Sequence, residues 1–192
     1  MPRILRPMRV FLDFEASSLG KDSYPIEVGW AGEDGWTEAH LIRPAPGWTD
    51  WDATAEAVHK ITLEQLLAEG EPHDAVARRV LEALAPHEVF VSAPSWDGKW
   101  MSVLLRAAKL PRHALRLRDS EEAFRNAVNE SLRGRRPDAE LRDLKLALIA
   151  EARRHATANG VSHRALADAR QELETWREVG RLARAAAGPI PD

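Results

Sequence analysis

The stretch Arg9-Val10-Phe11-Leu12-Asp13-Phe14-Glu15 is an apolar run that ends on two acidic residues, two positions apart. A β-strand projects alternate side chains to opposite faces, so Asp13 and Glu15 point the same way while the apolar residues that alternate with them point into a core. Two like charges side by side repel by up to about 1 kcal/mol in water, and a cation between them removes that cost. Because Mg²⁺ and Mn²⁺ prefer oxygen ligands, the pair indicates either a metal site or a solvated strand end.

Length and composition indicate one globular domain. The chain has 192 residues and an apolar fraction of 44%, which is enough for a sizeable core. We expect a single domain over residues 1–192, with its core at about 8–175 and a disordered tail at about 187–192.

The chain has no cysteine, which excludes disulfides, thiolate nucleophiles and zinc–sulfur sites. Its net charge of −3 argues against a protein that coats nucleic acid by bulk electrostatics, but not against an enzyme that binds one strand end through metal ions. The sequence shows no signal-peptide pattern and no apolar run long enough to cross a membrane. We therefore expect a cytoplasmic protein with no membrane partner.

The first third of the chain is predicted to be β-structure. Strands are expected at residues 9–14, 26–31 and 36–42. Glu33-Asp34-Gly35 predicts a tight hairpin between the second and third strands, because Asp-Gly tolerates the positive φ angles of such a turn. A loop rich in proline and glycine follows, and it carries Trp48 and Trp51.

The rest of the chain alternates helix and strand and then becomes helical. Thr62 and Asp74 are suitable N-caps for two helices, and Pro94 is expected to end a short buried strand. Helices are expected at residues 63–67, 76–84, 98–110, 121–132, 138–158 and 164–186, and further strands at 89–91 and 115–117. A hairpin followed by alternating strands and helices is typical of an α/β fold with a mixed sheet.

Asp97 follows the short buried strand Val89-Phe90-Val91 and lies where the next helix is expected to begin. Functional groups in open α/β sheets gather at strand ends and helix N-termini, so Asp97 is a candidate site residue. A carboxylate at a helix start is also stabilised by the helix dipole, and a capping role for Asp97 stays the alternative.

His163 and Asp168 form a second candidate pair near the C-terminus. Five steps along an ideal helix place two side chains about 140° apart, so the pair would not share a helix face. The two side chains converge if His163 lies on the loop before the helix and Asp168 lies inside it, and a loop histidine is suited to act as a general base. The alternative is a surface histidine and a solvated aspartate.

Taken together, these residues resemble the motifs of the DEDDh group of 3′→5′ exonucleases, within the ribonuclease H-like superfamily. The family's first motif, D-x-E-T-T-G-L, is similar to Asp13-Phe14-Glu15-Ala16-Ser17-Ser18-Leu19. Its third motif, H-x-A-L-x-D-A, is similar to His163-Arg164-Ala165-Leu166-Ala167-Asp168-Ala169. Other stretches that resemble the family are Tyr24-Pro25-Ile26-Glu27-Val28-Gly29-Trp30, Val58-His59-Lys60-Ile61-Thr62 and Trp96-Asp97. The resemblance spans residues 8–175 in the family's order.

The resemblance implies an α/β, ribonuclease H-like fold: a mixed five-stranded sheet flanked by helices, with a helix-rich C-terminal half. It also implies four carboxylates that hold two Mg²⁺ or Mn²⁺ ions, and a histidine that takes the proton from the attacking water. In this chain the implied metal ligands are Asp13, which bridges both ions, Glu15, Asp97 and Asp168, and the implied base is His163.

The resemblance further implies residues that hold the 3′ end of a substrate. The backbone of Ala16 and Ser17 is expected to approach the terminal nucleotide, and His59 to contact the scissile region. Leu19 resembles a family leucine that wedges against the terminal bases; the alternative is an ordinary loop leucine. Among the tryptophans, Trp48 and Trp51 are candidates for base stacking, whereas Trp96 and Trp100 are expected in the core.

We therefore expect a metal-dependent exonuclease that hydrolyses phosphodiester bonds from the 3′ end of single-stranded RNA or DNA, or of short oligonucleotides, with RNA favoured. The alternative is a catalytically inactive nuclease-fold module that binds nucleic acid or regulates another protein. Small family members commonly form homodimers, and the long C-terminal helices offer surface for one. The chain departs from the family pattern at Ala16, Ser18 and Ala93, but at none of the five catalytic-type residues.

Overall fold

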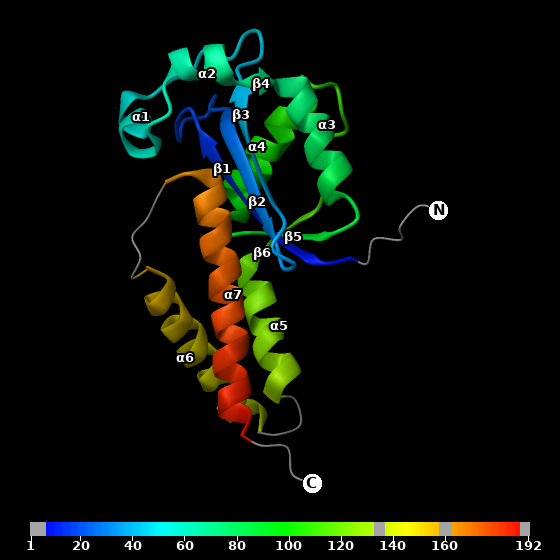
Figure 1. Ribbon diagram of the computed structural model, residues 1–192, viewed down its shortest axis with the longest axis vertical. Helices are drawn as coiled ribbons and strands as arrows, with labels where there is room; N and C mark the ends of the chain where they lie inside the picture. The colour runs from blue at the N-terminus through cyan, green and yellow to red at the C-terminus, as the bar shows by residue number, and fades with distance from the viewer. Residues whose placement is uncertain (1–6, 133–136, 158–162, 189–192) are drawn as a thin grey trace.

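The computed structural model describes residues 7–132, 137–157 and 163–188, which fold around one mixed β-sheet. Its strands are β1 (Arg9–Ala16), β2 (Pro25–Gly32), β3 (Thr37–Arg43), β4 (Glu71–Pro72), β5 (Glu88–Val91) and β6 (Leu117–Asp119). They are arranged in the order β4-β3-β2-β1-β5-β6 (Figure 1). β1, β2 and β3 pair antiparallel, as the hairpin signal predicts, while β5 runs parallel to β1 and β6 parallel to β5.

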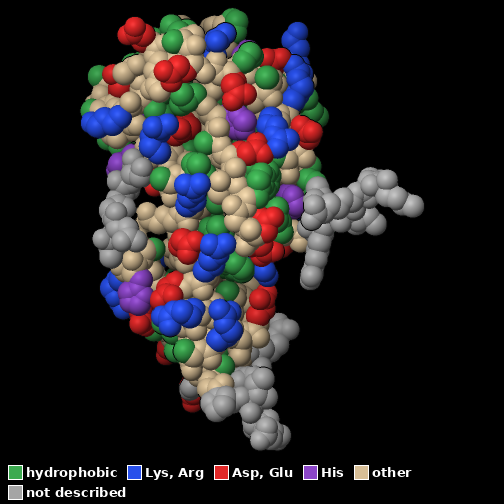
Figure 2. All heavy atoms as spheres, in the orientation of Figure 1, with side chains coloured by type: hydrophobic (Ala, Val, Ile, Leu, Met, Phe, Trp, Pro, Cys, Tyr) green, Lys and Arg blue, Asp and Glu red, His purple; other side chains and the backbone are tan. Residues whose placement is uncertain are grey.

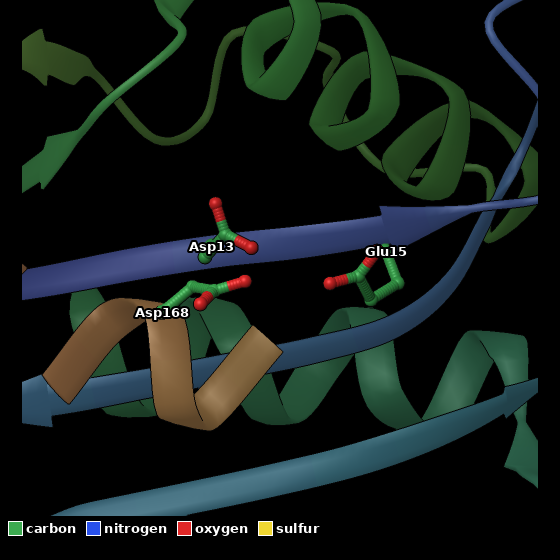
Figure 3. A group of neighbouring side chains, drawn as sticks. All are labelled: Asp13, Glu15 and Asp168. Carbon is green, nitrogen blue, oxygen red and sulfur yellow. The ribbon is translucent and has the colours of Figure 1, made fainter. Parts of the chain in front are cut away.

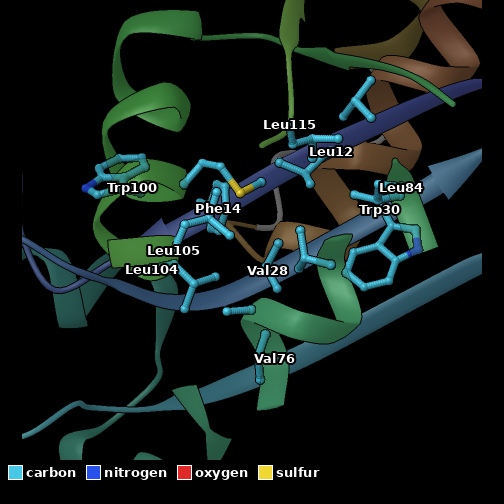
Figure 4. Close-up of a cluster of buried hydrophobic side chains, with 14 of the residues drawn as sticks. Leu12, Phe14, Val28, Trp30, Val76, Leu84, Trp100, Leu104, Leu105 and Leu115 are labelled. Atoms are coloured by element: carbon cyan, nitrogen blue, oxygen red, sulfur yellow. The ribbon is translucent and has the colours of Figure 1, made fainter. Parts of the chain in front are cut away.

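Helices cover both faces of this sheet. They are α1 (Ala53–His59), α2 (Leu63–Glu69), α3 (His73–Leu84), α4 (Pro94–Ala107), α5 (Ser120–Leu132), α6 (Asp138–Thr157) and α7 (Ala165–Ala187). α3 and α4 enclose a core against one face of β1 and β2 (Figure 4). α5, α6 and α7 form a second core on the other face and extend beyond the sheet as a bundle (Figure 1). The predicted α/β class is confirmed, with six strands in place of five.

The side chains of β1 alternate as the sequence predicts. Leu12 and Phe14 are buried in the core under α3 and α4, whereas Phe11 is buried in the opposite core. Asp13 and Glu15 share the face of Phe11, which is the face toward α7. The acidic pair therefore lies at the boundary between the sheet and the C-terminal helices.

Trp96 and Trp100 belong to the core on the α4 side, as expected. Trp100 is buried, and Trp96 stacks on it with ring centroids 5.5 Å apart. Both residues thus support α4 against the sheet.

The structure corrects several predicted boundaries. α4 begins at Pro94 and not at residue 98, because the first helical turn tolerates a residue without an N–H donor. Asp74 does not cap α3, whose N-cap is Pro72, with no side-chain hydrogen bond. β6 covers 117–119 rather than 115–117, and α7 continues through Ala187, into the predicted tail. Residues 189–192 lie outside the described part of the chain.

Two elements, α1 and β4, are not predicted from the sequence. α1 is capped by Asp52, which accepts a hydrogen bond from the N–H of Thr54, and it ends at Lys60 in the left-handed conformation. His59 is its one buried residue, so the helix has no apolar stripe that a sequence pattern can detect. β4 has two residues, too few for a pattern of alternation.

Figure 2 shows acidic and basic side chains interspersed over the face in view, in keeping with the small net charge. Within the described residues, no helix combines the length and the apolar character that a membrane crossing requires.

The pairing of β1 with β2 places two residues of β2 beside the acidic pair. Gly29 is the partner of Asp13, and Glu27 is the partner of Glu15. Gly29 also lies against the first turn of α7, where an added Cβ atom would be 2.3 Å from the backbone nitrogen of Leu166. The lack of a side chain at Gly29 therefore allows α7 to approach the sheet beside Asp13.

We predict that Gly29→Ala destabilises the protein by about 2 kcal/mol or more, because the added methyl group meets backbone atoms that cannot rotate away. Urea unfolding followed by circular dichroism measures the change. Gly98→Ala in α4 is the matched control: nothing lies within 4 Å of its Cβ position, so alanine should stabilise the helix by about 0.5–1 kcal/mol. Equal stability of Gly29→Ala and the wild type would contradict the close approach.

Candidate active site

Three carboxylates meet where α7 approaches β1. Asp13 and Glu15 come from β1, and Asp168 comes from the first turn of α7. One carboxylate oxygen from each residue lies within 4.8 Å of the others, and all three groups turn toward a common space (Figure 3). Each residue is partly buried. The structure thus brings together candidates from the two ends of the chain, and we call these three residues the carboxylate cluster.

Asp97 lies near the carboxylate cluster but is not one of its three members. It belongs to the first turn of α4, is 1% exposed, and accepts a hydrogen bond from the backbone N–H of Ala93 at 3.1 Å. Its charge raises the pKa of Asp13, second only to the effect of burial. Asp97 therefore helps to cap α4 and also acts on the cluster through its charge.

Burial and mutual repulsion disfavour the ionised forms of these carboxyl groups. Burial raises the pKa of Asp13 well above its ordinary value, and the charges of Asp97 and Glu15 raise it further. Burial also raises the pKa of Glu15 to about 7, with a further contribution from Asp168. It raises the pKa of Asp97 to about 7 as well. A cation bound here would stabilise the ionised forms.

His163 lies on the segment before α7 and Asp168 lies inside the helix, which is the arrangement that allows the two side chains to converge. His163 is exposed and has a φ angle of 47°. Burial raises the pKa of Asp168, and the nearby charge of His163 lowers it. The imidazole is thus close to the carboxylate cluster and open to solvent.

A further carboxylate, Glu172, lies one turn beyond Asp168 on α7 and is not among the residues predicted from the sequence. In addition to burial, the charge of Glu172 raises the pKa of both Asp13 and Asp97. Burial raises the pKa of Glu172 itself, while a hydrogen bond with Ser120 lowers it. The four-residue spacing from Asp168 is the signal that could have revealed it, because such residues share a helix face.

A pocket of about 270 Å³ opens beside Glu15, between the turn that follows β1 and helix α1. Leu19, Val58 and His59 are among the residues that line it. Leu19 is 70% exposed, whereas His59 is 3% exposed, and burial lowers the pKa of His59. A group bound in this pocket would have an apolar surface on one side and the carboxylate cluster close by.

The turn after β1 is held in place by Asp50. The hydroxyls of Ser17 and Ser18 both donate hydrogen bonds to Oδ2 of Asp50, and the backbone N–H of Tyr24 donates to Oγ of Ser17. Ala16 and Ser17 are both buried. The Ser17 side chain is therefore engaged within the turn, so a substrate contact at this position would fall to the backbone.

Trp48 and Trp51 pack within the protein. The ring of Trp48 stacks on Tyr24 with centroids 4.9 Å apart, and Nε1 of Trp51 donates a hydrogen bond to Glu56 at 2.7 Å. Both tryptophans are partly buried, and neither lines the pocket beside Glu15. Base stacking by these residues stays a prediction.

No protein-family model and no curated protein matches the sequence. Solved structures do match the fold. E. coli exonuclease I, in its zinc-bound complex with single-stranded DNA, superposes with a TM-score of 0.66 at 16% identity, over 95% of this chain and 42% of that chain. The chain has the fold of exonuclease I. Apo exonuclease I superposes with a TM-score of 0.66 at 16% identity, over 95% of this chain and 44% of that chain. The product-bound form superposes with a TM-score of 0.64 at 18% identity, over 92% of this chain and 44% of that chain.

The match with exonuclease I confirms the ribonuclease H-like fold that the motifs implied. This chain spans 42% to 44% of the length of those exonuclease I structures. The likeness at this level of identity is one of fold.

The raised carboxyl pKa values predict how the stability of the metal-free protein depends on pH. The pKa of Glu15 rises from 4.5 to about 7, and that of Asp97 from 3.8 to about 7. Between these limits the folded state binds more protons than the unfolded state, so the free energy of unfolding should fall as the pH rises from about 4 to about 7. Thermal unfolding in the presence of a chelator measures this dependence. At pH 8, added divalent metal should restore the stability that is lost as the pH rises.

Asp13→Asn should raise the Tm of the metal-free protein at pH 8, because it removes one charge from the carboxylate cluster. A gain on the order of 1 kcal/mol corresponds to about 2–4 °C for a chain of this size. Asp143→Asn, at an exposed position on α6, is the control and should leave the Tm within about 1 °C. A lower Tm for Asp13→Asn than for the wild type would show that the repulsion is not significant.

Proposed function

We propose that this chain is a metal-dependent 3′→5′ exonuclease, which hydrolyses phosphodiester bonds at the end of single-stranded nucleic acid. The observation that carries the proposal is the meeting of Asp13, Glu15 and Asp168 within 4.8 Å, beside an open pocket. The fold adds support, since E. coli exonuclease I has been crystallised with dT13 and dA16 oligonucleotides.

The donor set fits divalent cations that prefer oxygen ligands. It consists of carboxylates, it is partly buried, and its charges repel one another. Asp13, Glu15 and Asp168 would hold one Mg²⁺ or Mn²⁺ ion, and Asp97 would join Asp13 in holding a second. A pair of such ions would neutralise the phosphate and lower the pKa of a bound water.

His163 is the candidate general base. Its side chain is exposed and close enough to Asp168 to affect the pKa of that carboxyl. A neutral imidazole has a free ring nitrogen that can accept the proton of an attacking water, and its exposure lets it release that proton to solvent. Asp168 would keep the resulting imidazolium in place by charge.

The pocket beside Glu15 would hold the terminal nucleoside. Its volume of about 270 Å³ suits one small ligand, which favours a frayed or single-stranded end over a base pair. Leu19 and Val58 would offer apolar contact to a base, and the buried His59 would contact the scissile region. Because exonuclease I was crystallised with DNA, DNA is the first substrate to test, and the RNA preference stays a prediction.

We predict that the wild type degrades a 5′-labelled single-stranded oligonucleotide to a ladder in Mn²⁺ or Mg²⁺, and that His163→Ala lowers kcat by about 100- to 10,000-fold. Denaturing gels of matched DNA and RNA strands measure both the rate and the substrate preference. His155→Ala is the matched control, because His155 is an exposed histidine on α6 that pairs with Glu178. It should cleave like the wild type.

Undiminished hydrolysis by His163→Ala would remove this residue from the mechanism. A folded wild type that binds Mn²⁺ but yields no ladder would instead support the inactive nuclease-fold module.

Leu19→Ser should raise KM for the oligonucleotide about 10-fold, since the loss of apolar contact with a base costs about 1.5 kcal/mol. The Tm should not change, because the Leu19 side chain is 70% exposed. Leu146→Ser on α6 is the matched control at 66% exposure, and it should change neither quantity. Equal KM values for the two variants would show that Leu19 does not contact the substrate.

A further inference from the structure

Glu27 is a buried carboxylate outside the carboxylate cluster. It lies on β2, paired with Glu15 in the sheet, and is 3% exposed. It accepts hydrogen bonds from Nη2 of Arg164 at 2.6 Å and from Nε of Arg164 at 3.1 Å. It accepts another from the backbone N–H of Ala165 at 2.9 Å. We call these contacts the Glu27–Arg164 clasp, which ties β2 to the start of α7.

The clasp supplies what a local helix cap usually supplies. Arg164 is the N-cap residue of α7, and its side chain makes no capping hydrogen bond. The first N–H groups of a helix need acceptors, and a carboxylate at this end is favoured by the helix dipole. Glu27 provides such a carboxylate from a strand distant in the sequence. The position of the start of α7 is therefore set from β2.

The clasp lies between two candidate residues of the proposed site. His163 directly precedes Arg164, and Asp168 follows it within the first turn of α7. The positions of both therefore depend on how Arg164 and Ala165 are held. Because Glu27 is paired with Glu15 across the sheet, the clasp also sets this helix end relative to the acidic pair of β1.

The charge of Glu27 does not favour an ionised cluster. It raises the pKa of Glu15 and of Asp168, in each case in addition to burial. Buried ion pairs contribute little stability relative to apolar residues of the same size, but they can specify one arrangement over others. The Glu27–Arg164 clasp therefore acts on the site mainly by fixing the positions of its residues, and less by its charge.

We propose that Glu27 is a positioning residue for the exonuclease reaction, an inference that rests on the proposed function. Through the clasp it sets Asp168 and His163 relative to the carboxylates of β1. A displacement of about 1 Å at a reacting group can lower a rate about 100-fold, so Glu27 affects the reaction without touching the substrate.

Glu27→Gln tests the proposal, because glutamine keeps the size of the side chain and removes the charge that pairs with Arg164. We expect kcat to fall about 10- to 100-fold while KM stays within about twofold of the wild type. Mn²⁺ affinity, measured by calorimetry, should fall about 10-fold. In the metal-free protein, the amide of Ala165 should exchange its hydrogen about 10-fold faster, because it loses a charge-assisted hydrogen bond.

Glu38→Gln is the matched control. Glu38 on β3 accepts hydrogen bonds from Arg79 of α3 in a similar pair, away from the carboxylate cluster. This variant should lose stability but keep the kcat and Mn²⁺ affinity of the wild type. If Glu27→Gln does not fold, Arg164→Gln takes its place in the kinetic and calorimetric measurements, since the Arg164 side chain is 44% exposed.

The outcomes separate the two proposals. A wild type without nuclease activity overturns the proposed function, while Mn²⁺ affinity and amide exchange still test the clasp. An active wild type whose Glu27→Gln form keeps its kcat, Mn²⁺ affinity and exchange rate overturns the clasp alone. Equal losses in Glu27→Gln and Glu38→Gln also overturn it, because they would reflect general stability.

Discussion

The close contact between β2 and the first turn of α7 fixes where the C-terminal helix meets the sheet. Gly29 leaves room for the backbone of Leu166, and Glu27 on the same strand holds the N–H of Ala165. Because β2 is in register with β1, this contact also brings Asp168 to the acidic pair of β1. Helix packing and the geometry of the candidate site therefore have one physical origin.

The carboxylate cluster lowers the stability of the folded protein, because its buried like charges repel one another. Buried like charges are unfavourable, and proteins keep them where function requires a strained site. The protein offsets this repulsion only in part, since Arg164 lowers the pKa of Glu15 and His163 lowers that of Asp168, while burial raises both. The repulsion that remains explains why a divalent cation would bind with a gain in stability.

Much of the sheet could be predicted because its signals are local, such as the alternation in β1 and the Asp-Gly turn before β3. The meeting of Asp168 with Asp13 depends on how α7 docks at Gly29, so spacing alone could not predict it and the motif resemblance was needed. Glu172 and the packing of Trp48 on Tyr24 were missed for a related reason. A lone acidic residue on a helix, or a tryptophan on a loop, has no sequence signal that identifies a distant partner.

The carboxylates of β1 and α7, together with Asp97 of α4, are proposed to form one centre for two divalent ions. Titration of the chelator-treated protein with Mn²⁺, followed by electron paramagnetic resonance, counts the bound ions and measures their affinity. We expect two bound ions per wild-type chain and weaker binding, by about 10-fold or more, in Asp168→Asn. A wild type that binds no ion, or an Asp168→Asn protein that binds Mn²⁺ as tightly as the wild type, would contradict the proposed centre.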